Sequence, residues 1–437
     1  MVQRIDRRRV LTGIGAAGAF GLAGCLDGNG DDDTGNGNGD GNGNGDEDED
    51  TGNGDGDAGA DGRDVMVGVL QPTTGDLGDL GGPIRDAAIL PGIQLEDADI
   101  DFTIDIQDED TQTDTEAGIS AAQSLVDAGY PAITGAAASS TTIPVAETIL
   151  APNQVVGVSP ASTAPEITDL EDDDFLFRTC PSDALQGEVM AELAVDEGLE
   201  TAASFHLNND YGQQLSEAFV SAFEDLGGEV LEEVAFEAEQ PSYSSLLETA
   251  LGDEPDLMIV IGYPDSGQQI FRDYYDDFDG DETIMVTDGL RDDGLPGNVD
   301  NPMENVIGTA PLAAGPNVDA FTELFEDEFG SSPGVFTAQA YDATAVLILA
   351  NVAAGENDGP AVRDNLREVA NPGGEEIGPD NLAEGINMVA DGEEVQYQGA
   401  SSSVVFDENG DMEAVTYEVF EFDMDGVNTV DEIDFEA

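Results

Sequence analysis

The sequence contains no lysine, one histidine and two cysteines, and its basic residues are few. Eleven arginines stand against 96 acidic residues, which gives a formal charge of 11 − 96 = −85. This charge argues against nucleic acid or an anionic membrane surface as a partner, because both attract basic proteins. Self-repulsion would also weaken a compact fold unless salt screens it, and at molar salt the Debye length is about 3 Å. We therefore expect a protein that works in very high salt, as in an extreme halophile.

The scarcity of histidine and cysteine argues against an enzyme, since catalysis usually needs an activated nucleophile or a positioned base. A dyad of Cys180 and His206 is the remaining option, but a free cysteine is usually a small buried hydrophobic residue. Residues 407–411 resemble part of a calcium loop, yet Met412 stands where that loop needs glycine, so we expect a surface turn. The sequence has no phosphate-binding loop, zinc pattern or dinucleotide fingerprint. We expect no catalytic residues, no metal and no cofactor.

Residues 1–25 have the layout of an export signal with a lipid anchor. Three arginines, residues 7–9, precede an apolar segment, residues 13–24, that is too short to span a membrane. The arginines resemble a twin-arginine signal, and the sequence LAGC ending at Cys25 resembles a lipobox. The alternative is an ordinary cleaved signal with a chance cysteine. We expect lipid attachment at Cys25, a tether outside the cytoplasmic membrane, and no disulfide within the chain.

Residues 26–63 are almost only glycine, aspartate, asparagine and glutamate. This composition forms no core and predicts a disordered, self-repelling linker. From residue 64, strands and helices alternate, which predicts an α/β fold with parallel sheets covered by helices on both faces. Two such blocks meet near residue 180 and imply two lobes with a cleft. The expected strands are residues 65–70, 100–106, 131–134, 155–158, 202–207, 230–236, 257–262 and 283–287.

The expected helices include one at residues 83–90, which Pro91 and Gly92 should break or kink. A long apolar helix at residues 338–354 reads as a core helix and not as a membrane span, because Asp342 interrupts it. The other expected helices are residues 115–128, 143–150, 213–226, 243–251 and 267–275.

Two clusters of small hydroxyl residues follow neighbouring strands: SSTT at residues 139–142 and SPASTAPE at residues 159–166. In open α/β sheets, ligands bind beyond the carboxyl ends of the strands, and helix N-termini there offer free N–H donors. The clusters therefore suit a small anion such as a carboxylate. The alternative is helix capping, since Thr163 and Glu166 have capping-box spacing. The two interpretations overlap, because a cap leaves neighbouring N–H groups free.

The region from residue 64 to about residue 425 resembles the extracellular substrate-binding proteins of branched-chain amino acid ABC transporters. Their fold is the type I periplasmic binding protein fold. Each motif is short, and the order and spacing of the whole set carry the resemblance. Besides the two hydroxyl clusters with Gly135, the motifs are QPTTG at 71–75, FRT at 177–179, NDYG at 209–212, GY at 262–263, YQGA at 397–400 and FDENGD at 406–411.

The resemblance implies a two-lobed fold whose lobes are joined by three hinge crossovers, near residues 180–183, 308–312 and 393–400. Lobe 1 would comprise residues 64–181 and 311–396. Lobe 2 would comprise residues 182–310, and residues 397–437 would return to it.

The resemblance also implies a binding site. Ser139 and Thr163 would hold the α-carboxylate of an amino acid, and the carbonyl of Ala161 with the hydroxyl of Thr163 would take its ammonium. Asp288, from the other lobe, would complete the ammonium site through charge-assisted hydrogen bonds. The alternative is that Asp288 is an ordinary exposed acid, since exposed acids are the norm. Asp288 is also shorter than the glutamate found in some members.

Tyr211 and Tyr263 match aromatic positions that close over the ligand, and Phe336 matches a side-chain pocket position. Either tyrosine is otherwise a packing or turn residue. Leu80 stands where the family often has an aromatic residue, which alters the aliphatic pocket.

The implied function is that of a monomeric, lipid-anchored solute-binding protein of an ABC importer. It would close around one small amino acid and deliver it to the permease and ATPase subunits. The alternatives are amide, urea-like or aromatic carboxylate ligands, a sensor or receptor subunit that uses the same cleft, and a cleft that has lost its ligand.

Overall fold

The computed structural model describes residues 62–278 and 282–436. The predicted export signal, the lipobox cysteine Cys25 and nearly all of the predicted linker lie outside these residues.

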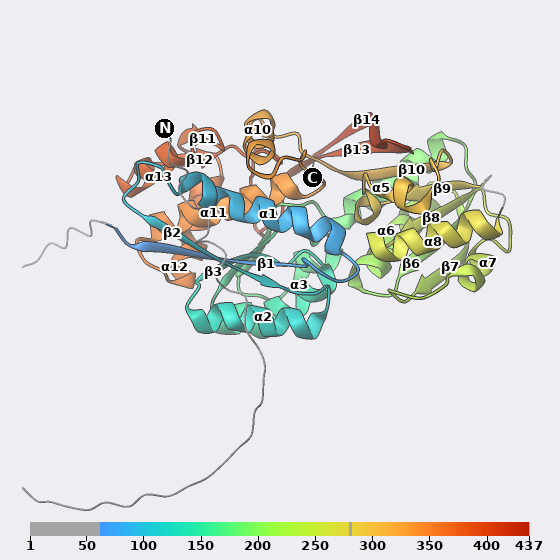
Figure 1. Cartoon of the computed structure of the whole chain (residues 1–437), viewed down its shortest axis with the longest axis horizontal. Coiled ribbons are helices and arrows are strands. Elements are labelled where there is room, and N and C mark those ends of the chain that lie inside the picture. The colour runs from blue at the N-terminus through green and yellow to red at the C-terminus, as the bar shows by residue number, and fades with distance from the viewer. Residues whose placement is uncertain (1–61, 279–281, 437) are drawn as a thin grey trace, which may run out of the picture. The chain divides into compact units, whose positions relative to one another are not determined.

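The first sheet has five parallel strands in the order β2-β1-β3-β4-β5. β1, β3 and β4 are almost wholly buried, as expected for parallel strands covered on both faces. Helix α1 (Gly78–Leu95) lies over one face of this sheet and α2 (Thr115–Ala128) over the other (Figure 1). The strands are β1 (Asp64–Gln71), β2 (Thr103–Asp110), β3 (Ala132–Gly135), β4 (Val156–Ser159) and β5 (Leu176–Arg178).

Helix α1 corrects the prediction of a break at Pro91. The helix starts at Gly78, contains both Pro83 and Pro91, and continues to Leu95. Proline removes one helical hydrogen bond, but most helical stability in proteins comes from packing of an apolar face. Here Ile84, Leu90 and Pro91 itself are among the buried residues. This packing holds the helix together across the proline.

Besides β4, the chain between β3 and β5, which carries both hydroxyl clusters, forms only short elements. They are α3 (Ser139–Val145), the π-helix η1 (Ala146–Leu150), α4 (Ala151–Asn153) and the 3-10 helix η2 (Pro165–Asp169).

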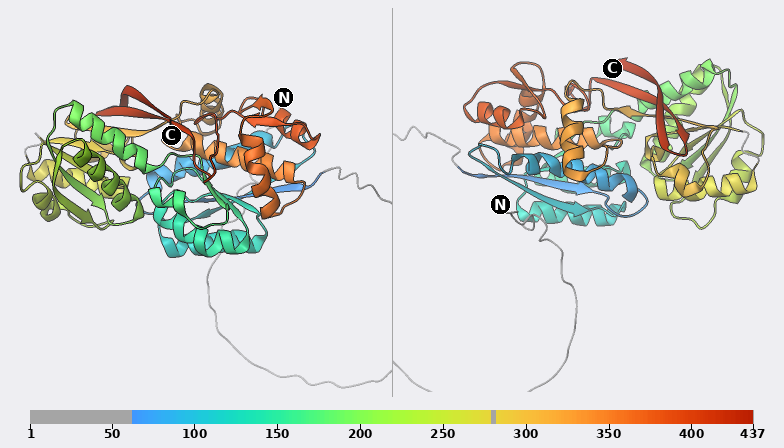
Figure 2. Two further views of the ribbon diagram at one scale, coloured as in Figure 1. Left: turned by 180° about the vertical axis from the view of Figure 1, so that it is seen from behind. Right: turned by 45° about the horizontal axis from the view of Figure 1, so that its top comes forward.

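The second sheet has seven strands in the order β14-β13-β10-β9-β8-β6-β7. Its five strands from β10 to β7 are parallel, which confirms the predicted parallel sheet, and only the edge strands β13 and β14 differ, because they pair antiparallel. A long C-terminal hairpin causes the difference, since a short turn can join only antiparallel strands. Its two strands run along the sheet edge, in red (Figure 1, Figure 2). The strands are β6 (Thr201–Leu207), β7 (Glu229–Phe236), β8 (Leu257–Ile261), β9 (Thr283–Val286), β10 (Val306–Leu312), β13 (Ala414–Asp423) and β14 (Gly426–Glu436).

Helices cover this sheet on both faces, as the alternating pattern predicts. They are α5 (Asp183–Asp196), α6 (Asp210–Asp225), α7 (Ser244–Ala250), α8 (Pro264–Asp277), the 3-10 helix η3 (Asp288–Leu290) and α9 (Leu295–Val299). We call the seven-stranded sheet with these helices the second lobe.

The first lobe is completed by the chain after β10. Helix α11 (Thr337–Ala354) is buried along nearly its whole length and packs against α1 and the first sheet, which confirms the expected core helix. None of the helices in the described ranges combines the length and apolar character that a membrane crossing needs. The other elements are α10 (Val318–Phe329), α12 (Gly359–Ala370), α13 (Leu382–Ala390), β11 (Glu375–Ile377) and β12 (Val395–Tyr397).

The chain passes between the two lobes three times: after β5, after β10 and between β12 and β13. Arg178 in the first passage donates to the Asp411 carboxylate in the third at 2.6 Å and 2.8 Å. Asp342 on α11 accepts from the Tyr397 hydroxyl at 2.8 Å and from the Ser401 N–H at 2.7 Å. Carboxylates therefore fix both ends of the third passage, and that of Asp342 is fully buried. The exact lobe boundaries given by the resemblance remain predictions.

Candidate functional site

The two hydroxyl clusters form one hydrogen-bonded unit at the carboxyl ends of β3 and β4. The Ser162 hydroxyl lies 2.7 Å from the Thr142 hydroxyl and donates to the carbonyl of Ala137 at 3.0 Å. The Ser139 hydroxyl accepts from the Ala164 N–H at 3.2 Å. The sequence placed both clusters at one sheet edge, and the structure joins them there.

Helix capping does not account for these clusters. Ala138 occupies the N-cap position of α3 and Ala164 that of η2, and neither helix has a side-chain cap. The Thr163 hydroxyl instead donates to the carboxylate of Asp183 at 2.9 Å. The capping alternative is therefore wrong for both helices, because no side chain of either cluster caps them.

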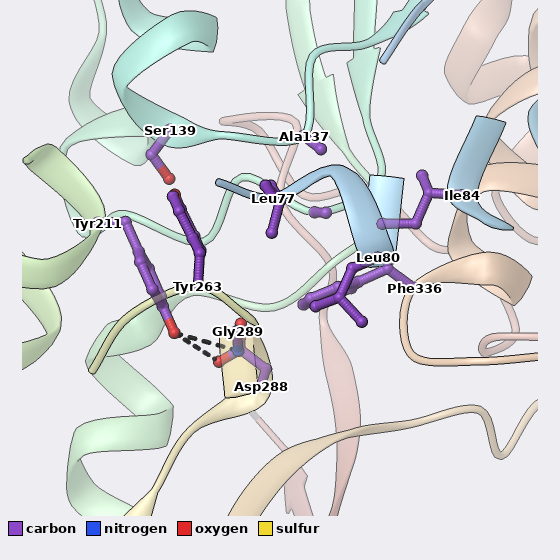
Figure 3. Close-up of a pocket in the computed structure, with 11 residues that line it drawn as sticks. Leu77, Leu80, Ile84, Ala137, Ser139, Tyr211, Tyr263, Asp288, Gly289 and Phe336 are labelled. Carbon is purple, nitrogen blue, oxygen red and sulfur yellow. Dashed lines mark hydrogen bonds between the residues drawn. The ribbon is translucent and has the colours of Figure 1, made fainter. Parts of the chain in front are cut away.

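A cavity of about 310 Å³ opens beside these clusters, between the two lobes (Figure 3). It brings together six of the seven ligand-binding residues that the resemblance implied: Ser139, Ala161, Tyr211, Tyr263, Asp288 and Phe336. The other lining residues are Leu77, Leu80, Ile84, Ala137 and Gly289.

Thr163 is the predicted residue that does not line this cavity. It is buried, and its hydroxyl hydrogen points to Asp183. This arrangement does not support a direct contact between the Thr163 side chain and a ligand. The ligand-binding roles of the other six residues remain predictions, although their positions agree with them.

One side of the cavity is an aliphatic wall built largely by α1. Leu77, Leu80 and Ile84 follow one another at intervals of three and four residues, which places them on one face of the helix. Figure 3 shows Leu80 and Ile84 on the same side of the view as Phe336, opposite Tyr211, with Leu77 between the two groups. Leu77 was missed from the sequence because the helix was expected to begin at residue 83, and Ile84 was placed in that helix without a role in the site. Their helical spacing was the available signal.

Phe336 approaches the cavity through an uncommon backbone conformation. Its φ of 61° is left-handed, although most non-glycine residues avoid that region. The residue occupies the N-cap position of α11 and is 4 % exposed. This conformation directs an aromatic ring to the aliphatic wall at the start of the core helix.

Two stacked tyrosines from the second lobe form the opposite side. The rings of Tyr211 and Tyr263 lie 5.5 Å apart and are inclined by only 3°. Tyr211 is in the first turn of α6, and Tyr263 occupies the N-cap position of α8. The Tyr211 hydroxyl contacts the Thr287 hydroxyl at 2.7 Å and donates to Asp288 at 3.3 Å. Tyr211 therefore forms part of the cavity wall and also hydrogen-bonds to the Asp288 carboxylate.

Asp288 supplies the acidic group of the site. It begins η3 directly after β9 and is only 3 % exposed. Burial raises the pKa of its carboxyl to about 6, while the nearby Gln186 side chain and the Tyr211 hydroxyl lower it. None of the described residues that line the cavity is basic. A cationic group of a ligand would therefore offset a charge that the protein leaves uncompensated at the cavity.

The expected absence of catalytic machinery fits the positions of the two reactive side chains. Cys180 is fully buried, burial raises the pKa of its thiol, and its Sγ contacts the Ser162 carbonyl at 3.4 Å. His206 lies on β6 and its Nδ1 is 3.1 Å from the Ser204 hydroxyl. No hydrogen bond joins the two in the described part of the chain.

The acidic turn at residues 407–411 is a structural element. Asp407 Oδ1 accepts from the N–H groups of Asn409 at 2.7 Å and Asp411 at 2.9 Å. Asp411 in turn binds Arg178. In residues 62–278 and 282–436, no group of acidic, cysteine or histidine side chains is arranged to hold a metal ion.

Comparison with known proteins identifies the family to which this two-lobed chain belongs. A profile described as "Periplasmic binding protein" matches residues 64–381, which is most of the chain. This chain belongs to the periplasmic binding protein family. It is a solute-binding protein, and the family confirms the expectation that it is not an enzyme.

The chain is similar to one curated relative and to two solved structures that are named with different ligands. The chain is 27 % identical over 357 residues to the chemotactic signal transduction system substrate-binding protein BasB of Halobacterium salinarum, covering 78 % of this chain and 83 % of BasB. It matches the structure of the leucine-binding protein LivK of Thermotoga maritima with a TM-score of 0.72 and 25 % identity, covering 84 % and 98 % of the two chains. A solute-binding protein from R. palustris in complex with benzoate has a TM-score of 0.67 at 16 % identity, covering 84 % and 96 %, and shows the same fold.

Proposed function

We propose that this periplasmic binding protein binds a small amino acid with an aliphatic side chain and delivers it to an ABC permease. The observation that supports this most is the combination of groups around one cavity. Ser139 lies at one end, Asp288 comes from the opposite lobe, and Leu77, Leu80 and Ile84 form an aliphatic wall. An α-amino acid has a carboxylate, an ammonium and a side chain that match these three parts.

The carboxylate would bind beside Ser139, at the start of α3. Free N–H groups at a helix N-terminus favour an anion. The Ser139 hydroxyl already accepts from the Ala164 N–H, so its hydrogen is free to be donated to a ligand. The ammonium would bind beside Asp288 and the carbonyl of Ala161, which also lines the cavity. A buried carboxylate with a raised pKa gains most from such a cation.

The size of the cavity supports a small ligand. The empty space of about 310 Å³ includes the part that is open to solvent, so the enclosed room is smaller still. Ser139, Tyr211, Tyr263, Asp288 and Phe336 are each less than 5 % exposed. We infer that this arrangement is the closed one, with a ligand of a few carbon atoms enclosed between the lobes.

An aromatic carboxylate is the second ligand class, since a neighbour of the same fold binds benzoate. Such a ligand has no ammonium and would leave Asp288 without a cation. Two specific features therefore favour an amino acid over an aromatic acid: the buried Asp288 and the aliphatic residue at Leu80.

A sensory role with the same ligand is the second candidate function, and the similarity to BasB favours it. The two roles are distinguished in a strain from which the gene for this protein has been deleted, by measuring amino acid uptake and chemotaxis. Loss of labelled amino acid uptake with normal chemotaxis supports transport, while the reverse supports sensing.

The export and anchoring features belong to this proposal as well. We infer a twin-arginine signal, a lipid on Cys25, a flexible acidic tether and a monomeric binding protein at the outer face of the cytoplasmic membrane of a halophile. Mass spectrometry of the native protein tests the anchor. If the anchor is present, residues 1–24 have been removed and the mature chain begins at a lipidated Cys25. An unmodified Cys25 would contradict it.

Thermal unfolding in molar KCl with a ligand panel tests the ligand assignment. We expect leucine, isoleucine or valine to raise the melting temperature, because a ligand that binds only the folded state stabilises it. A rise with benzoate, acetamide or urea and none with any amino acid would contradict the assignment.

A further inference from the structure

A second buried acid, Asp183, lies behind the cavity. It is the first residue of α5, has no exposed surface and is not one of the lining residues. Its N–H donates to the Thr163 carbonyl at 2.8 Å, and its Oδ2 accepts from the Thr163 hydroxyl at 2.9 Å. Its Oδ1 has no hydrogen-bond partner among the described residues. Thr163 therefore fixes the carboxyl group and leaves one oxygen unsatisfied.

Asp288 lies beside the Gln186 side chain, one turn along α5 from Asp183, and its charge opposes the ionisation of Asp183. Burial raises the pKa of Asp183 well above its ordinary value, and the charge of Asp288 raises it further. Two like charges in a low-dielectric site resist ionising together, so one of them keeps its proton. The titratable groups that Asp183 acts on from the surrounding elements are Arg178, Cys180, Tyr211, Tyr263 and Tyr417.

Arg178 is the one cation in this described set, and its N–H groups already have acceptors. Its Nε and Nη2 donate to the Asp411 carboxylate, and its Nη1 donates to the carbonyls of Ser162 and Ala164. The remaining members are a thiol and three phenols whose pKa values burial raises, so they are neutral at pH 7. The pair of acids therefore has no cation of its own.

We propose that Asp183 is a positioning acid of the ligand site, which carries a proton on Oδ1 in the ligand-free protein and releases it to water when a cationic group occupies the cavity beside Asp288. This inference rests on the proposed amino acid ligand. The O–H bond of the carboxyl breaks, the proton passes to water or buffer, and the carboxylate remains. The entering ammonium replaces the lost proton as the positive charge near the pair.

The proposal assigns a regulatory property to the site. Below the pH at which Asp183 ionises in the ligand-free protein, binding and proton release are coupled, and affinity falls as the pH falls, by about tenfold per pH unit for one proton. The ionised Asp183 also accepts from Thr163 in the bound state. This interaction holds the second hydroxyl cluster in place against α5.

Calorimetric titration of the purified protein with leucine, in molar KCl at pH 7.5, tests this coupling. The titration is run in phosphate and in Tris, which differ in ionisation enthalpy. The variant Asp183→Asn shows whether a released proton comes from this acid. We expect release of about one proton per leucine in the wild type. In Asp183→Asn this release disappears, while Asp127→Asn, which neutralises an exposed acid on α2, keeps it.

Leucine binding with equal enthalpies in both buffers would overturn the proposal and leave the proposed function intact. If no amino acid binds the wild type, the proposed function fails. The protonation of Asp183 is then tested by the pH dependence of the stability of the ligand-free protein. A proton held by Asp183 makes the wild type lose more stability than Asp183→Asn between pH 6 and pH 8. Equal losses in the wild type, Asp183→Asn and Asp127→Asn would overturn the proposal. If Asp183→Asn does not fold, the two-buffer titration of the wild type and Asp127→Asn with leucine still decides.

Discussion

Asp76 and Ser266 join the two lobes outside the ligand cavity. Asp76 follows β1 in the first lobe, and its Oδ1 accepts from both the N–H and the hydroxyl of Ser266, each at 2.8 Å. Ser266 lies in the first turn of α8 in the second lobe. A carboxylate of one lobe thus caps a helix of the other, where the helix dipole favours a negative charge.

This contact predicts that Asp76→Ala weakens ligand binding although Asp76 does not line the cavity. Hydrogen bonds to a charged group contribute about 1.5–3 kcal/mol. Their loss destabilises the closed arrangement, so we expect the Kd for leucine to rise about tenfold or more. Asp79→Ala is the matched control, because Asp79 reaches Gln268 only at 3.4 Å on the surface. Equal affinities of Asp76→Ala and wild type would show that the contact does not contribute to closure.

The pH dependence of ligand-free stability should depend on Asp288. Its pKa is raised from 3.8 to about 6 in the folded protein, so the folded state holds this proton more tightly than the unfolded state. Stability is therefore lost as the pH rises from about 4 to about 6, by about 3 kcal/mol for this group. Asp288→Asn should flatten the denaturation profile in this window. If the stability of Asp288→Asn depends on pH as that of the wild type does, the pKa of Asp288 is not raised by burial.

Much of the fold was predictable because the strong signals are local. Helix α2 begins and ends at the predicted residues, and β1 and β4 agree within one residue, because their apolar patterns are regular. The proline in α1 misled the prediction, since packing against α11 is not visible in a local pattern. The C-terminal hairpin was not predicted as two strands, because its alternation is weak and strongly acidic.

The site was predictable only where a motif carried it. Ser139, Tyr211 and Asp288 came from the resemblance, and no local pattern distinguishes Asp288 among 96 acidic residues. Asp183 was missed for the same reason. Its role depends on burial and on the neighbouring charge, which only the folded chain shows.

The buried Arg178 should be essential for stability. Its guanidinium has no exposed surface, and it binds Asp411, the Thr168 hydroxyl and two carbonyls. Removing one partner of a buried pair costs about 3–5 kcal/mol, and lysine lacks the planar fork. We expect both Arg178→Ala and Arg178→Lys to lower the denaturation midpoint strongly. Arg363→Ala, which breaks a surface pair with Asp364, should cost less than about 1 kcal/mol. Equal effects would refute the structural role of Arg178.

Leu80 should set the size of the ligand side chain. Leu80→Phe adds a ring to the aliphatic wall and reduces the space for a branched side chain. We expect the affinity for leucine to fall at least tenfold relative to that for alanine, because overpacking typically costs about 1–3 kcal/mol. Calorimetry with both amino acids measures the ratio, and Leu226→Phe on the exposed end of α6 is the control. If the ratio of the leucine and alanine affinities is unchanged, the side chain of the ligand does not contact Leu80.

Recognition of both charged groups of one solute is tested most directly by titrating the protein with leucine and with two analogues in molar KCl. One analogue, 4-methylpentanoate, lacks the ammonium, and the other, 3-methylbutylamine, lacks the carboxylate. We predict that leucine binds at least about 100-fold more tightly than either, since each analogue leaves a buried polar group unpaired. Asp288→Asn should reduce the preference for leucine over 4-methylpentanoate. Equal binding of leucine and 4-methylpentanoate by the wild type would contradict the account.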